Sequence, residues 1–377
     1  MPLSSQHCDF RPRTRFVFGA GTLDQVGELA RSLGGSRALI VSDPGVVAAG
    51  YPERARGQLE AAGLKVFFYS DIEENPTTRH VDHGVAVAKE NSIDLIVGLG
   101  GGSSMDCAKG INFLLTNGGR MADYWGVGKA SKPMLPLIAI PTTAGTGSEA
   151  QSFALIADAE THQKMACGDP KAAAAAAILD PTLSLSQPAR VTAMTGIDAV
   201  SHAVETWVTK KRNPISQMYA GEAWRLLRAN FPRVVQNPDD LEARAGMLLG
   251  ANYAGTAIEN SMLGAAHSCA NPLTAHYDIV HGAAVGLMLP AVVRFNGSEF
   301  GPLYSQLPGA TDGAHGIAGE IEEMVKLAGL PTRLSEHGIA ESALPDLARE
   351  AARQWTANFN PRPVTVKELL EIYQCVY

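Results

Sequence analysis

Between about residues 37 and 181, short apolar or β-branched runs alternate with helix-length segments, and this alternation constrains the fold of the 377-residue chain most strongly. The strand-length runs cover residues 38–41, 66–69, 95–99 and 137–140. Polar, Gly or Pro residues follow each run, and then comes a segment of helical length, such as 54–62 or 79–90. Such connections are typical of parallel strands joined by helical crossovers. The first half of the chain is therefore predicted to be a doubly wound α/β domain.

After Pro188 the pattern changes to long Ala- and Leu-rich amphipathic stretches, which predict helices. These stretches cover residues 193–208, 215–229, 241–256 and 317–328. A chain of this length usually exceeds what one hydrophobic core supports. The prolines Pro181 and Pro188 interrupt the chain between the two patterns. We therefore predict an α/β domain over residues 1–184 and an all-helical domain over residues 185–377.

Charge and cysteine content exclude several classes of protein. Lys and Arg total 31 against 38 Asp and Glu, a net charge of −7, and no basic run could neutralise a nucleic-acid backbone. The five cysteines are scattered and never form CxxC, which favours a reducing compartment, so we expect a cytoplasmic protein. The first twenty residues lack the apolar core of a signal peptide, and no stretch has the length of a membrane span.

A glycine-rich segment, GLGGGSSMD at residues 98–106, directly follows the run 95–97 and opens a helix. Consecutive glycines let the backbone approach a pyrophosphate without Cβ clashes, and the N–H groups at a helix start supply positive potential. Ser103 and Ser104 add hydroxyl donors. The segment predicts a phosphate-binding loop, with a glycine-rich turn that binds no ligand as the alternative.

Two other strand ends carry polar residues. Residues 38–42 stop at Asp43, whose carboxylate could accept the hydroxyls of an adenosine ribose and would repel a 2′-phosphate, or could merely cap a helix or turn. The segment IPTTAGTGSE, residues 140–149, places hydroxyls and glycines after another strand. It is a candidate lining for a nicotinamide ring, and an ordinary turn is the alternative.

Asp198 and His202 are spaced i, i+4 on the predicted helix 193–208, so their side chains project from one face. His267 and His281 follow on either side of a Pro-containing segment. Three imidazoles and one carboxylate suit a first-row divalent ion such as Fe²⁺ or Zn²⁺. Each His by itself is more often an ordinary satisfied or exposed residue, and His276 is expected to be either a loop residue or one that orients its neighbours by hydrogen bonding.

At these residues the chain resembles the iron-containing (group III) alcohol dehydrogenase family, nearly from end to end. The matching segments are residues 16–21, 75–77, 100–103 with Asp106 and Lys109, 141–149, 196–199 with His202, 272–273, 281–282 and 360–363. Glycerol dehydrogenases and dehydroquinate synthases, which share the superfamily, differ from this chain at residues 142–149. The latter also have Glu at the position of Asp198. The alcohol dehydrogenase branch therefore fits best.

The resemblance implies a dehydroquinate synthase-like fold with a dinucleotide-binding α/β domain and a helical metal- and substrate-binding domain. It implies an NAD-linked enzyme that interconverts a small alcohol and its aldehyde or ketone, on one divalent ion, with Fe²⁺ expected and Zn²⁺ the alternative. We also expect a homodimer or higher homo-oligomer. The metal ligands implied are Asp198, His202, His267 and His281. The cofactor contacts expected are Asp43, Asn75, Gly100, Gly101, Gly102, Ser103, Asp106, Thr142, Thr143, Thr146 and Lys164.

One position departs from the family. Many members have a second His four residues after the third metal ligand, often assigned to proton relay, where this chain has Asn271. Asn cannot titrate, so protons would leave through water and the cofactor ribose, or through another group such as His276. Alternatively, Asn271 caps a turn before Pro272.

Two rival functions stay open from the sequence. One is a non-redox synthase or lyase of the same superfamily that acts on a sugar-like substrate. The other is a non-catalytic NAD-binding or metal-sensing protein, which should lack one or more of the ligands.

Overall fold

The computed structural model describes residues 8–377, and the chain divides into two compact units. The α/β unit comprises residues 11–143 and 147–187, and the helical unit comprises residues 188–377 together with 8–10 and 144–146. The main boundary thus falls after Gln187, three residues beyond the one expected from the sequence. The division also gives two short segments of the first half to the helical unit, which the sequence pattern did not suggest.

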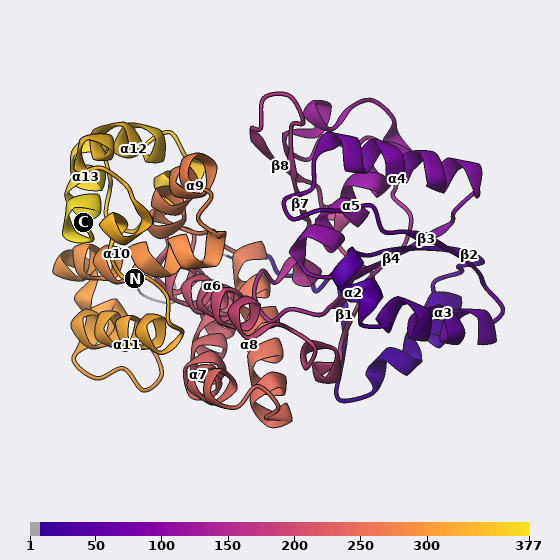
Figure 1. The fold of residues 1–377 in the computed structure, drawn as a ribbon, viewed down its shortest axis with the longest axis horizontal. Coiled ribbons are helices and arrows are strands. Elements are labelled where there is room, and N and C mark those ends of the chain that lie inside the picture. The colour runs from indigo at the N-terminus through magenta and orange to yellow at the C-terminus, as the bar shows by residue number, and fades with distance from the viewer. Residues whose placement is uncertain (1–7) are drawn as a thin grey trace. The chain divides into compact units, whose positions relative to one another are not determined.

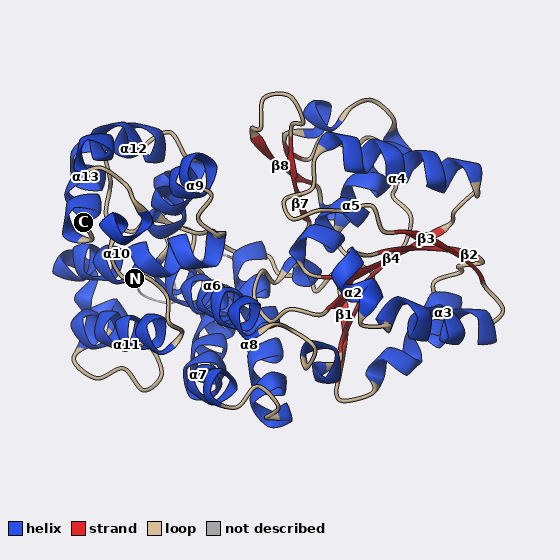
Figure 2. Ribbon diagram, viewed as in Figure 1, coloured by secondary structure: helices blue, strands red, loops and turns tan. Residues whose placement is uncertain are grey.

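The α/β unit is built on a six-stranded sheet in the order β1-β9-β6-β4-β2-β3, and every neighbouring pair is parallel. Figure 2 shows the strands in red, with β1 to β4 labelled. The strands are β1 (Arg15–Phe18), β2 (Arg37–Val41), β3 (Lys65–Tyr69), β4 (Leu95–Gly100), β6 (Leu137–Pro141) and β9 (Ala176–Leu179). All four strands predicted from the sequence are present. A second sheet of three short strands contains β5 (Gly126–Val127), β7 (Phe153–Ala157) and β8 (Lys164–Gly168).

Five helices accompany this sheet: α1 (Val26–Ser32), α2 (Pro44–Ala48), α3 (Tyr51–Ala61), α4 (Thr78–Glu90) and α5 (Gly102–Asn117) (Figure 1). Because side chains alternate along a strand, β2 contributes to two separate cores. Leu39 packs in the core that includes residues of α4 and α5, whereas Ile40 packs in the core that includes residues of α1 and α3. The sheet is therefore covered by helices on both faces, as its uninterrupted apolar strands predict.

The helical unit contains α6 (Ala189–Val208), α7 (Pro214–Gln236), α8 (Leu241–Glu259), α9 (Ala265–Tyr277), α10 (His281–Tyr304), α11 (Gly313–Leu327), α12 (Leu344–Ala351) and α13 (Val366–Cys375). Helix α6 packs against α7, α8 and α10, and α10 packs against α9 and α11. The predicted fold class, an α/β first half followed by a helical second half, is confirmed.

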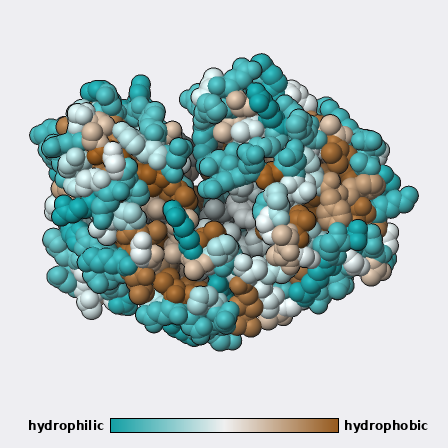
Figure 3. Space-filling model, in the orientation of Figure 1, coloured by the Kyte–Doolittle hydropathy of each residue, from teal (hydrophilic) through white to brown (hydrophobic). Residues whose placement is uncertain are grey.

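Hydrophilic side chains cover much of the face shown in Figure 3, with hydrophobic patches between them. Met218 and Val127 are among the large hydrophobic residues that are exposed. Within residues 8–377, no helix is long and apolar enough to cross a membrane.

Candidate metal centre and cofactor-binding loops

The four candidate metal ligands come together inside the helical unit. Helix α6 provides Asp198 and His202, α9 provides His267 in its first turn, and α10 begins with His281. Oδ1 of Asp198 lies 3.4 Å from Nε2 of His202, 3.7 Å from Nε2 of His267 and 3.9 Å from Nε2 of His281. Candidate ligand atoms of Asp198, His267 and His281 all lie within 4.8 Å of one another. Three of the four expected ligands therefore form one compact group, and His202 adjoins it through its contact with Asp198.

Close packing of α10 on α6 brings His281 to Asp198. Gly282 lies so near the backbone of α6 that a Cβ atom there would overlap the carbonyl oxygen of Met194. One turn later, a Cβ on Gly286 would overlap the side chain of Ile197. Only residues without a side chain permit this approach. The two glycines thus explain why the first residue of α10 can share a site with the middle of α6.

The site is buried and polar. Asp198, His202 and His267 are each 5% exposed or less, and His281 is partly exposed. Burial acts to raise the pKa of Asp198, but the imidazoles of His202, His267 and His281 outweigh it and hold that pKa well below its usual range. Burial lowers the pKa of His202, although the carboxylate of Asp198 opposes the shift. An anionic carboxylate beside a neutral imidazole is the state in which both residues bind a cation.

Three atoms test whether these residues fit a metal ion. Among the described residues, Oδ1 of Asp198, Nδ1 of His202 and Nε2 of His267 are buried side-chain atoms without a hydrogen-bond partner. Leaving a buried polar atom unpaired costs about 1–3 kcal/mol, so such groups are rare unless something else satisfies them. Two of the three, Oδ1 of Asp198 and Nε2 of His267, face each other. Nδ1 of His202 does not belong to this pair, because it is Nε2 of His202 that faces Asp198. The donor set of nitrogen and carboxylate oxygen suits Fe²⁺ or Zn²⁺.

Sequence reasoning missed Glu205. It lies on α6 three residues after His202 and is 3% exposed. Its Oε2 lies 2.5 Å from Nδ1 of His267, on the side of the ring opposite Nε2. A carboxylate that contacts the second nitrogen of a metal-binding His is a recurrent arrangement. The i, i+3 spacing from His202 and the i, i+7 spacing from Asp198 place all three on one helix face and could have indicated it.

Asn271 lies inside α9, one turn after His267, with Pro272 also inside the helix. The alternative in which Asn271 caps a turn before Pro272 is therefore wrong. Its Nδ2 donates to Oε1 of Gln354 at 3.1 Å. His276 is also on α9 rather than in a loop, and its Nε2 lies 2.7 Å from Oε2 of Glu350 at an exposed position, outside the cluster of candidate ligands.

The glycine-rich segment forms a tight turn between β4 and α5. Gly100 has a φ of +154°, and a Cβ there would overlap Oγ of Ser104 and lie 2.9 Å from Oδ2 of Asp43. Gly101 is the N-terminal cap residue of α5, and no side chain caps that helix. The backbone N–H groups at the start of α5 thus keep their capacity to bind an anion.

Asp43 caps a helix, which was the alternative to ribose binding considered from the sequence. Its Oδ1 accepts from the backbone N–H of Val46 at 3.1 Å, which caps α2, and its Oδ2 accepts from Oγ of Ser104 at 3.0 Å. These contacts fix the carboxylate beside the glycine-rich turn. Ser42, just before it, has a buried hydroxyl without a hydrogen-bond partner among the described residues.

Asn75, Ser103 and Lys164 form a second group in the α/β unit. Asn75 has a positive φ of 56°, its backbone N–H donates to Oγ of Ser103 at 3.3 Å, and its Oδ1 accepts from Nζ of Lys164 at 3.1 Å. Residues far apart in the sequence thus meet near the start of α5.

The segment that follows β6 is hydrogen-bonded to the end of β4. The backbone N–H of Thr142 donates to the carbonyl of Gly100 at 2.9 Å, and the hydroxyl of Thr143 is buried without a hydrogen-bond partner among the described residues. Thr146 belongs to the helical unit.

Asp106 faces inward, because its Oδ1 accepts from Oγ of Ser148 at 2.7 Å and it is 9% exposed. Asp106 therefore holds the loop in place, and its contacts do not support direct cofactor binding.

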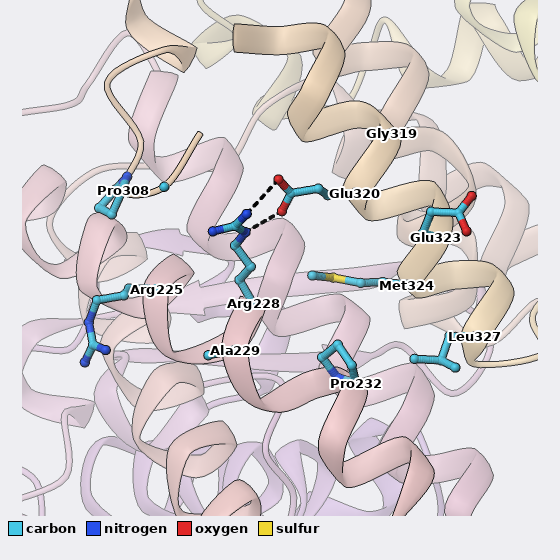
Figure 4. A pocket seen from close by; sticks show the side chains of 11 residues that line it. Arg225, Arg228, Ala229, Pro232, Pro308, Gly319, Glu320, Glu323, Met324 and Leu327 are labelled. Atoms are coloured by element: carbon cyan, nitrogen blue, oxygen red, sulfur yellow. Dashed lines mark hydrogen bonds and ion pairs between the residues drawn. The ribbon is translucent and has the colours of Figure 1, made fainter. Parts of the chain in front are cut away.

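A pocket of about 890 Å³ lies elsewhere in the helical unit, between α7 and α11 (Figure 4). Arg228 of α7 forms a hydrogen-bonded ion pair with Glu320 of α11 at this pocket, and Met324 and Leu327 add apolar surface. None of the candidate metal ligands lines it. This pocket is therefore separate from the candidate metal centre.

Two family profiles match most of the described chain. The family profile "iron-containing alcohol dehydrogenase" matches residues 12–181, and the C-terminal profile of Fe-containing alcohol dehydrogenases matches residues 192–377. An NAD-dependent methanol dehydrogenase from Bacillus methanolicus is 35% identical over 94% of this chain and 96% of its own length.

Two solved structures are similar in fold. A 1,3-propanediol oxidoreductase has a TM-score of 0.94 at 32% identity and covers 98% of this chain and 99% of its own. A sulfoacetaldehyde reductase from Bifidobacterium kashiwanohense, in complex with NAD⁺, has a TM-score of 0.89 at 28% identity and covers 98% of this chain and 98% of its own.

Proposed function

This chain belongs to the iron-containing alcohol dehydrogenase family and is an NAD-linked alcohol dehydrogenase, and we propose that Asp198, His202, His267 and His281 hold its catalytic metal ion. The net reaction converts an alcohol and NAD⁺ into a carbonyl compound, NADH and a proton. A divalent cation supplies Lewis acidity that lowers the pKa of an alcohol hydroxyl.

The observation that carries the proposal is the group of buried, unpaired ligand atoms around Asp198. Oδ1 of Asp198 and Nε2 of His267 have no hydrogen-bond partner among the described residues, although both are buried. Imidazole and carboxylate ligands are compatible with either of the ions considered from the sequence. We propose Fe²⁺, following the name of the family, with Zn²⁺ as the alternative.

The α/β unit is the proposed site of the cofactor. Gly101, Gly102 and Ser103 would bind the pyrophosphate at the start of α5, where no side chain caps the helix. Asp43 would bind the adenosine ribose, since its carboxylate is fixed beside Gly100. Asn75, Lys164, Thr142 and Thr143 of the same unit complete the proposed set, and Thr146 of the helical unit stays an expectation from the resemblance. We propose NAD rather than NADP, because Asp43 would lie close to a 2′-phosphate.

The relatives suggest where to begin a substrate search. Proteins named methanol dehydrogenase and 1,3-propanediol dehydrogenase are 35% and 34% identical to this chain. We therefore propose a small primary alcohol or diol as substrate. The proposal is tested by following NADH absorbance with a panel of such alcohols, before and after metal removal by a chelator and after re-addition of Fe²⁺ or Zn²⁺. Alcohol oxidation that survives complete metal removal would contradict it.

Two further proposals concern the whole protein. We propose a cytoplasmic location, supported by five free cysteines in the described chain, three of them buried. We also propose a homodimer or higher homo-oligomer, as the family resemblance implied. Light scattering of the purified protein decides the second point, and a mass equal to one chain would contradict it.

A further inference from the structure

Glu205 contacts two adjacent residues at the start of α9, and one of them, His267, is a proposed metal ligand. Its Oε1 accepts from the backbone N–H of Ala266 at 2.7 Å, and its Oε2 contacts Nδ1 of His267 at 2.5 Å. The two oxygens of this buried carboxylate thus contact two adjacent residues at the start of α9. A carboxylate oxygen can only accept, so Nδ1 of His267 carries the proton in this contact.

The proton position determines what His267 can bind. A neutral imidazole with its proton on Nδ1 has its lone pair on Nε2, which is the atom that faces Asp198 at 3.7 Å. We propose that Glu205 is a positioning residue that fixes His267 as the Nδ1–H tautomer and directs Nε2 toward the metal ion. This inference rests on the proposed function, because it assumes that His267 is a ligand.

The start of α9 is built around the same contact. Gly264 is the N-terminal cap residue and provides no side chain, and a Cβ there would lie 3.0 Å from Oε1 of Glu205 and 3.1 Å from Oδ1 of Asn360. Asn360 accepts from the N–H of Ala265 at 3.3 Å. Two side chains from distant segments therefore take the place of a local cap, and they fix the first turn of α9, where His267 lies.

A purely structural role is the alternative, in which Glu205 only caps α9. Glu205→Gln separates the two roles because an amide has one acceptor oxygen and one NH₂ group. If the oxygen accepts from Ala266, the NH₂ group faces Nδ1 and forces the proton of His267 onto Nε2. If the amide is reversed, the NH₂ group faces the N–H of Ala266. Neither orientation serves both contacts.

Asp180→Asn provides a matched control in the α/β unit. Asp180 is fully buried, and its two oxygens accept from the backbone N–H groups of Gly21 and Leu23, both at 3.1 Å. The change removes one buried acceptor, as Glu205→Gln does, but leaves the helical unit unaltered. Comparable stability losses with different metal affinities would therefore identify an effect on the metal site.

The experiment measures Zn²⁺ dissociation constants by competition with a chromogenic chelator, together with thermal midpoints of the metal-free proteins. We expect Glu205→Gln to weaken Zn²⁺ binding about 10- to 100-fold and Asp180→Asn to leave it within about twofold. Glu205→Asp, which retains two acceptor oxygens, should bind Zn²⁺ more tightly than Glu205→Gln. Equal affinity of Glu205→Gln and the wild type would overturn the inference.

Metal binding by the wild type distinguishes a failure of this inference from a failure of the proposed function. Failure of the wild type to bind Zn²⁺ or Fe²⁺ refutes the metal site itself, whereas tight binding unchanged by Glu205→Gln refutes only the role of Glu205. If Glu205→Gln does not fold, ¹⁵N NMR of histidine side chains in the Zn²⁺-loaded wild type decides, with His267→Ala used to assign the resonance. The inference requires the proton of His267 on Nδ1, and a proton on Nε2 overturns it.

Discussion

Nε2 of His267 lies 3.7 Å from Oδ1 of Asp198, and within the described part of the chain neither buried atom has a hydrogen-bond partner. The separation is too long for a hydrogen bond. Burial without a partner would cost each atom about 1–3 kcal/mol. A shared cation would satisfy both, and this relationship underlies the predictions on the metal site.

His281→Ala should abolish metal binding and alcohol oxidation while the chain stays folded. His281 is the first residue of α10 and its side chain is 33% exposed, so its removal leaves no large cavity. Elemental analysis, circular dichroism and NADH formation should be measured on the same preparation. Wild-type activity in a metal-free His281→Ala protein would refute the assignment of this residue.

Asp43→Gly should relax the preference for NAD. The unmodified carboxylate would lie close to a 2′-phosphate, and repulsion between like charges in a partly buried site is worth several kcal/mol. We expect the ratio of kcat/KM for NADP to that for NAD to rise about tenfold or more. Asp71→Gly, at an exposed position of the same unit, controls for net charge. Equal efficiency with both cofactors in the unmodified protein would remove Asp43 from this role.

The parallel sheet was predictable because its interior strands are uninterrupted apolar runs followed by turn residues. β1 and β9 were missed for different reasons: Arg15–Phe18 is a short edge strand, and Ala176–Leu179 begins within a run of alanines that favours no strand. The candidate ligands Asp198 and His202 follow from helical spacing. Their approach to His281 does not, since it depends on how closely Gly282 lets α10 pack on α6.

Contacts between residues far apart in the sequence could not be predicted from the sequence either. Glu205 and His267 are 62 residues apart, and no local pattern links a carboxylate on α6 to the ring at the start of α9. Asn271 shows the opposite difficulty. Pro272 suggested a turn at that point, but the helix continues through it because tertiary packing overrides a local preference.

Asn271→His should change the pH dependence of turnover without changing metal content. Asn271 lies one turn after His267 on α9, so a His there would lie on the same helix face as the proposed ligand. An added imidazole should introduce or shift a limb at about pH 6–7. Turnover against pH and the thermal midpoint should be measured for both proteins. An unchanged profile with a lowered midpoint would show that Asn271 matters only for its hydrogen bond to Gln354.

Lys109→Met should destabilise the protein by about 3–5 kcal/mol, because it removes the buried positive charge that lies 3.8 Å from the buried carboxylate of Asp106. Nζ of Lys109 is completely buried and donates to the carbonyl oxygens of Ser148 and Phe153 at 2.7 and 2.8 Å. Lys326→Met removes an exposed ammonium group and should change stability by less than about 1 kcal/mol. Urea unfolding compares the two, and equal losses would contradict a special role for Lys109.

The central claim, that one divalent ion held by Asp198 and the three histidines supports alcohol oxidation, is tested most directly by elemental analysis coupled to an activity assay. Protein purified without oxygen should contain about one Fe²⁺ or Zn²⁺ per chain. Its NADH formation from a small alcohol should disappear with the ion on chelation and return when the ion is restored. Full activity in protein shown to contain no metal would contradict the account.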